Sequence, residues 1–162
     1  MEYISTRNTQ KTFSFKDVFL KGLAPDGGLF VPKKIPLYTS QELEELRNLS
    51  YNELATKIIL KFCSDEFNEI EIKDLVKNSY KNFRVSDVVV IKKLGKVNLL
   101  ELFHGPTLAF KDIAMQVIGN MYEKILKKNN LKINVVVATS GDTGAAAINA
   151  IRDRKNMKIF VL

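Results

Sequence analysis

The sequence predicts a mixed α/β protein: a small, mainly helical N-terminal domain over residues 1–84, then the beginning of a parallel α/β sheet over residues 85–162. Three observations support this. Apolar residues recur at helical spacing between residues 40 and 80. Candidate strands and helices alternate from Val88 onward. Three of the four prolines lie in the first 36 residues. The change of pattern near Arg84 sets the predicted boundary.

The first 36 residues combine one short helix with turn-forming residues. Phe13–Lys21 predicts a helix, with Ser14 as its N-cap. Ala24–Gly28 contains an Asp-Gly-Gly sequence and predicts a turn, because glycine adopts positive φ without steric cost. Leu29–Val31 predicts a short extended segment, which Pro32 ends.

Three helices are expected between Ser40 and Tyr80. Ser50 followed by Glu53 is a capping-box pattern, which predicts the start of the second helix. Acidic residues suit the N-terminus of the first helix, since the helix dipole is positive there. The apolar positions at helical spacing are Leu54, Ile58, Phe62, Ile70, Ile72, Leu75 and Val76.

Beyond Arg84 the pattern alternates between strands and helices. Strands are expected at Val88–Ile91, Val97–Phe103, Ile133–Ala138 and Met157–Leu162, and helices at Ile113–Lys128 and Ala145–Arg152. The strand–helix–strand–helix–strand order that begins at Val97 predicts a parallel sheet. Because the sequence ends within an apolar strand, we expect this sheet to be truncated, as in a piece of a larger fold.

Composition argues against several classes of protein. No apolar run approaches the roughly 20 residues that span a bilayer, and the N-terminus lacks the apolar segment of a signal peptide. The one cysteine, Cys63, cannot form an internal disulfide, so a cytoplasmic location is expected. The formal net charge is +7, but only five of the 25 basic residues are arginine and acids lie among the lysines. This pattern argues against a nucleic-acid-binding surface.

The segment Glu101–Asp112 carries residue types suited to a chemical site. A strand is followed by a Gly-Pro turn and a helix, which places Lys111 at the junction between turn and helix. Apolar neighbours and the positive end of a helix dipole both favour the neutral form of an amine, which is the form that reacts with aldehydes. The alternative is that Lys111 is simply one of 20 lysines that reach solvent.

The chain has one histidine and one cysteine, two residue types that often take part in chemistry. His104 is the only histidine, so a histidine cluster around a metal is excluded and no metal site is expected. Its side chain either contacts a ligand or donates to the backbone. Cys63 lies on the apolar face of a predicted helix, and we expect it in the core rather than as a nucleophile.

A second segment, Ala138–Ala147, follows a strand and opens a helix. Gly141 and Gly144 allow a sharp turn, and the free N–H groups of a first helical turn favour an anion. The hydroxyls that can add hydrogen bonds are those of Thr139, Ser140 and Thr143. The alternative is a tight turn capped by Ser140 or Asp142. The segment lacks the lysine of a Walker loop and the glycine spacing of a dinucleotide fingerprint.

Together these segments resemble threonine synthase, a family of fold-type II enzymes that use pyridoxal 5′-phosphate (PLP). The resemblance is carried by LFHGPTLAFKD at Leu102–Asp112, ATSGDTG at Ala138–Gly144, GLAPDGGLFVP at Gly22–Pro32, and Tyr3–Arg7. These four segments occur in the family's order, and the resemblance extends over essentially the whole chain. Other fold-type II lyases and β-replacing enzymes usually read Asn-Pro-Thr-Gly-Ser-Phe-Lys at the lysine segment, which argues against them.

The resemblance implies a role for each residue of the two segments. Lys111 would form the Schiff base with PLP and later move protons. Asp142 would face the cofactor ring, and Phe110, His104 and Asp112 would shape the pocket on the lysine side. The residues that would hold the α-carboxylate of the substrate are Ser140, Gly141, Thr143 and Gly144. The implied reaction converts O-phospho-L-homoserine and water to L-threonine and phosphate.

The resemblance also implies that other parts of the site lie beyond Leu162, namely the loop that holds the cofactor phosphate and the partner of the pyridine nitrogen. We therefore expect this sequence to be an N-terminal portion of the enzyme that is inactive without a C-terminal part. A second polypeptide is one source of that C-terminal part. The alternatives are a non-catalytic remnant or subunit, another fold-type II lyase, and a nucleic-acid-binding protein.

Overall fold

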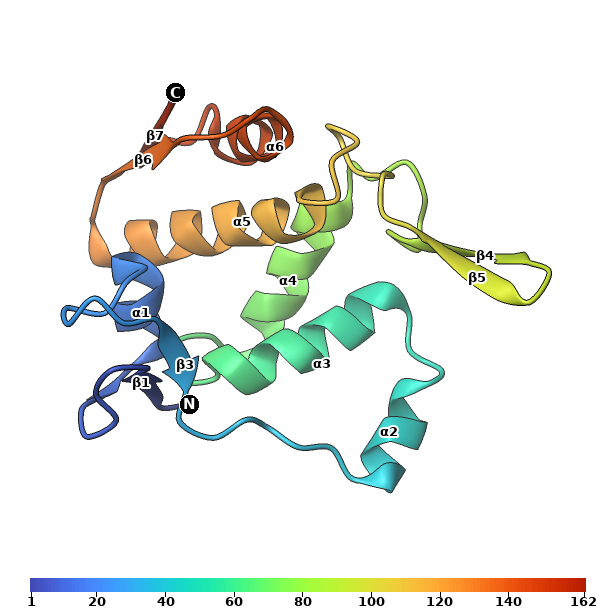
Figure 1. Ribbon diagram of the computed structural model, residues 1–162, viewed down its shortest axis with the longest axis horizontal. Helices are drawn as coiled ribbons and strands as arrows, with labels where there is room; N and C mark the ends of the chain where they lie inside the picture. Colours follow the sequence, from blue (N-terminus) through green and yellow to red (C-terminus); the bar gives the residue numbers. More distant parts are fainter. The chain divides into compact units, whose positions relative to one another are not determined.

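The computed structural model describes residues 1–162 and divides into two compact units, Met1–Asp74 and Leu75–Leu162 (Figure 1). The dividing point falls within helix α4 (Glu69–Tyr80). The predicted domain boundary after Arg84 stays a prediction. The mixed α/β composition that the sequence predicts is confirmed. All of the helices are too short or too polar to cross a lipid bilayer.

The first unit contains a three-stranded antiparallel sheet in the order β2–β1–β3. Its strands are β1 (Tyr3–Ser5), β2 (Thr12–Phe13) and β3 (Phe30–Pro32). Tyr3 and Phe13 are paired in register, and both are buried. Of these strands, only β3 overlaps a segment that was predicted to be extended. Strands of two or three residues are too short for the alternation of apolar and polar side chains to show in the sequence.

Helix α1 (Phe15–Lys21) confirms the predicted helix and its cap at Ser14, except that Phe13, the predicted first residue, lies in β2. The Ser14 hydroxyl accepts a hydrogen bond from the N–H of Asp17 at 3.1 Å, and Gly22 ends the helix at a φ of 71°. Phe15 faces inward and packs against the rings of Tyr3 and Phe67. This aromatic cluster joins the helix to the small sheet.

Helices α2 (Ser40–Leu46) and α3 (Tyr51–Cys63) both begin with a capping box. The box of α3 is the predicted pair Ser50 and Glu53. The box of α2 begins at Thr39, one residue before the expected start of the helix. The predicted core position of Cys63 is confirmed, because the thiol is fully buried and its burial raises the pKa to about 12. Ile72 and Val76 of α4 are also fully buried.

One strand of the second unit differs from the prediction. Val97–Phe103 was expected to join the parallel sheet, and this expectation is wrong: β5 (Val97–Glu101) pairs antiparallel with β4 (Val90–Leu94) in a separate hairpin. Leu94 pairs directly with Val97, so Gly95 and Lys96 form the whole connection. Gly95 has a φ of 61°, which suits so short a turn.

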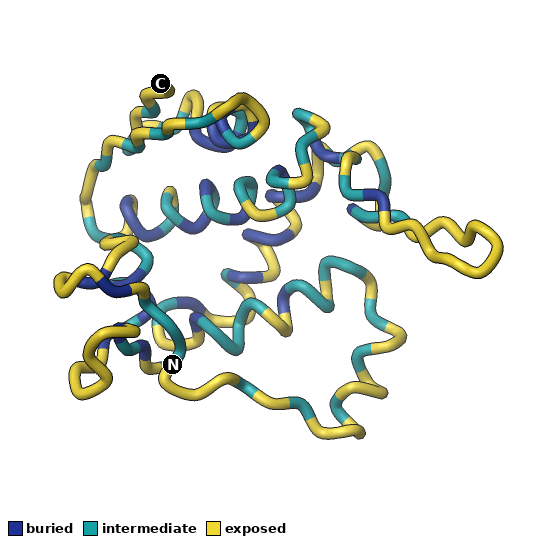
Figure 2. The backbone as a smooth tube through the Cα atoms, viewed as in Figure 1, coloured by how far each residue is buried: buried dark blue, intermediate teal, exposed yellow.

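The rest of the second unit follows the predicted order. Helix α5 (Asp112–Asn129) precedes β6 (Ile133–Val137), and α6 (Asp142–Ile151) connects β6 to β7 (Met157–Val161), which runs parallel to β6. The face of α5 that carries Val117, Met121 and Ile125 is buried, and buried positions recur along the helix in Figure 2. Helices α5 and α6 lie side by side (Figure 1). A Cβ atom added at Gly119 of α5 would lie 2.6 Å from the carbonyl oxygen of Ala150 in α6.

Candidate functional site

An ion pair joins the two segments that the sequence singles out. Lys111 Nζ lies 3.1 Å from Asp142 Oδ2, although the residues are 31 positions apart in the sequence. Lys111 immediately precedes α5, and Asp142 is the first residue of α6. Because these helices pack against each other, their N-terminal residues meet.

The Lys111–Asp142 pair is accessible to solvent. The side chain of Lys111 is 30% exposed and that of Asp142 is 52% exposed. The Lys111 hydrogen bond, followed by the N–H of Thr143, lowers the pKa of Asp142, so this carboxylate is ionised at neutral pH. Solvent screens a pair this exposed, so an incoming ligand can replace the contact at little cost. Lys111 Nζ also lies 4.3 Å from the centroid of the Phe110 ring.

The turn between β6 and α6 requires glycine at two positions. Gly141 has a φ of 143°, which side chains rarely adopt, and the space beside it is open. At Gly144 a Cβ atom would lie 2.5 Å from Thr139 Cγ2. Gly141 is the N-cap of α6 and has no side chain, so neither Ser140 nor Asp142 occupies the N-cap position.

Several N–H groups of this turn already have acceptors. Thr139 Oγ1 accepts from the N–H groups of Gly141 and Gly144, at 3.2 and 3.3 Å. Asp142 Oδ1 accepts from the N–H of Thr143 at 2.8 Å. A carboxylate therefore already lies at the N-terminus of α6. A ligand carboxylate that used the Thr143 N–H would have to replace it, while the exposed Ser140 offers a hydroxyl nearby.

The structure places His104 against a buried acid, Glu101. His104 Nε2 lies 2.9 Å from Glu101 Oε2, and Lys92 Nζ lies 2.6 Å from Glu101 Oε1. Lys92 and then His104 lower the pKa of Glu101, so the acid is ionised and can only accept. The hydrogen is therefore on Nε2 of His104, which leaves Nδ1 for another partner. Glu101 was not among the predicted site residues, although its spacing of three residues from His104 was a usable signal.

Asp112, which the resemblance places at the lysine side of the pocket, has no exposed surface. Its two carboxylate oxygens accept from Thr107, one from the backbone N–H and one from the hydroxyl, each at 2.8 Å. Thr107 was not among the predicted site residues. A hydroxyl five residues before an acid at a helix start was the only signal available.

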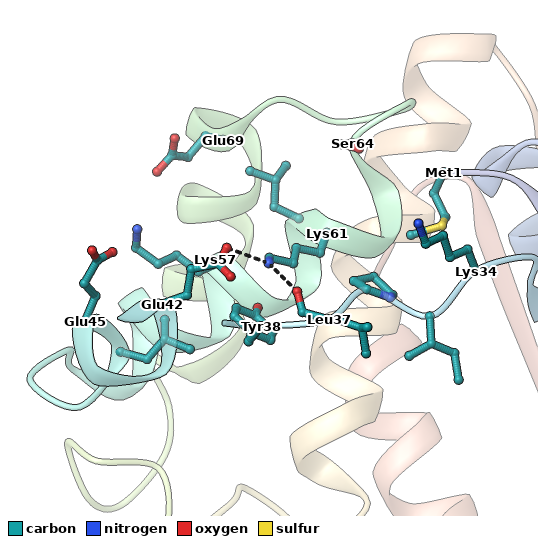
Figure 3. A pocket seen from close by; sticks show the side chains of 14 residues that line it. Met1, Lys34, Leu37, Tyr38, Glu42, Glu45, Lys57, Lys61, Ser64 and Glu69 are labelled. Carbon is teal, nitrogen blue, oxygen red and sulfur yellow. Dashed lines mark hydrogen bonds and ion pairs between the residues drawn. The ribbon is translucent and has the colours of Figure 1, made fainter. Parts of the chain in front are cut away.

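Lys111 lines neither of two cavities of the structure. One, of about 860 Å³, belongs to the first unit, where Lys61 donates to the Leu37 carbonyl and Glu42 and lies over the Tyr38 ring (Figure 3). It contains none of the predicted site residues. A second, of about 640 Å³, is lined by polar groups that hydrogen-bond one another, such as Gln116 with Asn149. No group of three or more His, Cys, Asp or Glu side chains gathers as a metal site would require.

Comparisons with known proteins agree along the whole chain. Residues 2–80 match the family model of the threonine synthase N terminus. The chain is 44% identical to threonine synthase of Schizosaccharomyces pombe and 40% identical to that of Pseudomonas aeruginosa, matching over its full length. It spans 34% and 35% of those two proteins, about a third of each.

Solved structures give the same result. The crystal structure of PLP-bound threonine synthase from Brucella melitensis matches with a TM-score of 0.94 and 40% identity, over 99% of this chain and 35% of that chain. Yeast threonine synthase matches with a TM-score of 0.93, also at 40% identity and over the same shares of the two chains. The structure of this chain therefore matches the N-terminal third of these proteins.

Proposed function

Because this chain belongs to the threonine synthase family and corresponds to its N-terminal part, we propose that it supplies the PLP-binding lysine and part of the substrate site of a threonine synthase. The reaction is the conversion of O-phospho-L-homoserine and water to L-threonine and phosphate. The observation that carries the proposal is the 3.1 Å ion pair between Lys111 and Asp142, which unites the two signature segments. The β6–α6–β7 unit is the proposed beginning of the parallel sheet of fold-type II enzymes.

The surroundings of Lys111 fit PLP, an aldehyde that carries a phosphate. When bound, PLP withdraws electrons from the substrate so that protons can leave its carbon atoms. The amine of Lys111 is partly exposed, so an aldehyde can reach it from solvent. Two helices, α5 and α6, begin beside it, and their dipoles favour anionic groups there. The Phe110 ring offers an apolar surface next to Nζ.

Lys111 is the proposed proton carrier of the site. As an ammonium it donates to Asp142, and as a neutral amine it is a nucleophile or a base. Asp142 has a lowered pKa and stays ionised, so it accepts hydrogen bonds and holds Nζ in place without giving up a proton. In the proposed site Asp142 also faces the cofactor ring.

The turn of residues 140–144 is the proposed binding site for the α-carboxylate of the substrate. Support comes from the exposed hydroxyl of Ser140 and from the N–H of Thr143, which a substrate carboxylate would take over from Asp142. The groups proposed to hold the substrate carboxylate are Ser140, Gly141, Thr143 and Gly144. His104, fixed by Glu101 through Nε2, presents Nδ1 as the atom left for a ligand.

We propose this activity for the chain together with a C-terminal part, either in the same polypeptide or in a second one, in the cytoplasm. The chain spans about a third of its relatives, and several apolar side chains of the second unit lie exposed. Phe160 of β7 and Leu100 of β5 are about half exposed. A larger fold would cover such residues, because exposed apolar area is costly in water. Neither a nucleic acid nor a membrane is among the proposed partners.

The experiment is reconstitution. The chain is co-expressed with a polypeptide that covers the remaining length of the Schizosaccharomyces pombe relative, and phosphate release from O-phospho-L-homoserine is measured. We expect release with the parental chain and with Lys96→Ala, an exposed hairpin lysine, and none with Lys111→Ala. Release that survives Lys111→Ala would overturn the proposal. No release from an assembled complex would favour the alternative of a non-catalytic subunit.

A further inference from the structure

A fully buried carboxylate lies next to the proposed site lysine. Asp112 is 0% exposed, and its Oδ2 and Oδ1 accept from the N–H and the hydroxyl of Thr107, each at 2.8 Å. A buried polar group needs hydrogen bonds, since burial removes its contacts with water. These two bonds are short and well formed. They tie the two ends of the segment Thr107–Asp112 together.

Gly105 makes room for the carboxylate. A Cβ atom at this position would lie 2.5 Å from both the Cβ and the Oδ2 atoms of Asp112. The carbonyl of Gly105 also accepts from the N–H of Leu108 at 3.2 Å, which closes the turn around Pro106. The Gly-Pro-Thr sequence therefore provides both the space for the Asp112 side chain and its hydrogen-bond donors.

The segment between Thr107 and Asp112 needs such a restraint. Leu108 has a φ of 68°, a left-handed conformation that residues other than glycine rarely adopt. Such a conformation persists only where the surrounding contacts enforce it. Helix α5 has no side-chain cap, because Lys111 occupies the N-cap position with a helical backbone. The side-chain hydrogen bonds within this segment all involve Thr107: two join it to Asp112, and its Oγ1 also accepts from the N–H of Ala109 at 3.4 Å.

We propose that Asp112 is a positioning residue: through Thr107 it holds the segment 107–111 so that Lys111 Nζ reaches Asp142. The carboxylate has no exposed surface, so it touches neither solvent nor a ligand. Its effect passes through the backbone to the neighbouring lysine. The expected effect on the reaction of Lys111 with PLP rests on the proposed function. The restraint, which is the pair of bonds between Thr107 and Asp112, does not depend on it.

The test compares Thr107→Val with Thr107→Ser, each in the chain of 162 residues. Valine has nearly the shape of threonine but lacks the hydroxyl, whereas serine keeps the hydroxyl, and both keep the backbone N–H. The first readout is amide hydrogen exchange. In Thr107→Val we expect about tenfold faster exchange at Leu108 and Asp112, equivalent to about 1.4 kcal/mol. Thr107→Ser should stay close to the parental rates. Unchanged exchange at Ile125, in the core of α5, shows that the protein remains folded.

The second readout is the reaction of Lys111 with PLP, trapped by borohydride and quantified by peptide mapping against Lys96 in the same sample. We expect less labelling of Lys111 in Thr107→Val and parental labelling in Thr107→Ser. Equal exchange in the two variants would overturn the restraint. Faster exchange in Thr107→Val with unchanged Lys111 labelling would overturn the positioning role. No Lys111 labelling in the parental chain, with exchange as expected, would count against the proposed function and leave the restraint standing.

Discussion

Gly119→Ala is expected to destabilise the protein, although alanine is the better helix former. Gly119 is buried in the middle of α5, where replacing glycine with alanine gains about 1 kcal/mol of helix propensity. An added Cβ atom would lie 2.6 Å from the carbonyl oxygen of Ala150 in α6. That oxygen belongs to the backbone and cannot rotate away. Overpacking of this kind costs about 1–3 kcal/mol. We therefore expect a net loss of about 1 kcal/mol in the free energy of unfolding.

Urea unfolding, followed by circular dichroism, measures this effect. Ala114→Gly is the matched control, because Ala114 is exposed in the same helix and reports propensity alone. We expect the control to lose about 1 kcal/mol. A gain in stability for Gly119→Ala would refute the close packing of α5 on α6. Since this packing brings Lys111 to Asp142, the same result would also weaken the proposed site.

Further predictions concern buried groups. Cys63 is fully buried with a pKa raised to about 12, so iodoacetamide at about pH 8 should leave it unmodified until urea is added; rapid labelling of the folded chain would contradict its burial. Ile125→Ala should cost about 3 kcal/mol of unfolding free energy, since the side chain is fully buried; a loss below about 1 kcal/mol would contradict its core position. Lys92 and His104 lower the pKa of Glu101, so its ionised form stabilises the fold above its ordinary pKa of 4.5. That contribution is lost as pH falls through the lowered pKa. The stability gap between the parental chain and Glu101→Gln should therefore close in acid, and a gap independent of pH would be inconsistent with this.

The predictable parts of the fold are those with long periodic patterns or strong local signals. The buried face of α5 and the capping box at Ser50 depend on residues close in sequence, so the pattern identifies them. Strands β1 and β2 are too short for this. The partner of β5 was predicted wrongly because pairing depends on the connection: Gly95 and Lys96 allow an immediate hairpin, and closing so short a loop costs less chain entropy than pairing with a distant strand.

The candidate site was predictable residue by residue but not as an arrangement. Lys111 and Asp142 stood out through their neighbours in sequence, whereas their contact depends on how two helices pack. The buried hydrogen bonds of Asp112 were even harder to predict from the sequence, because an acid at the start of a helix is common and usually solvated. Only the structure shows that this acid is fully enclosed.

The identity of the lysine that reacts with PLP is the most direct test of the proposed site. The chain is incubated with PLP, reduced with borohydride and digested, and modified peptides are quantified over all 20 lysines. The fold places Lys111 at two helix starts beside Asp142 and Phe110, so modification should concentrate on Lys111. In Lys111→Ala it should fall to the background level of the other lysines. Modification spread evenly over the surface lysines, with Lys111 no more reactive than Lys96, would contradict the assignment of Lys111 as the PLP-binding residue.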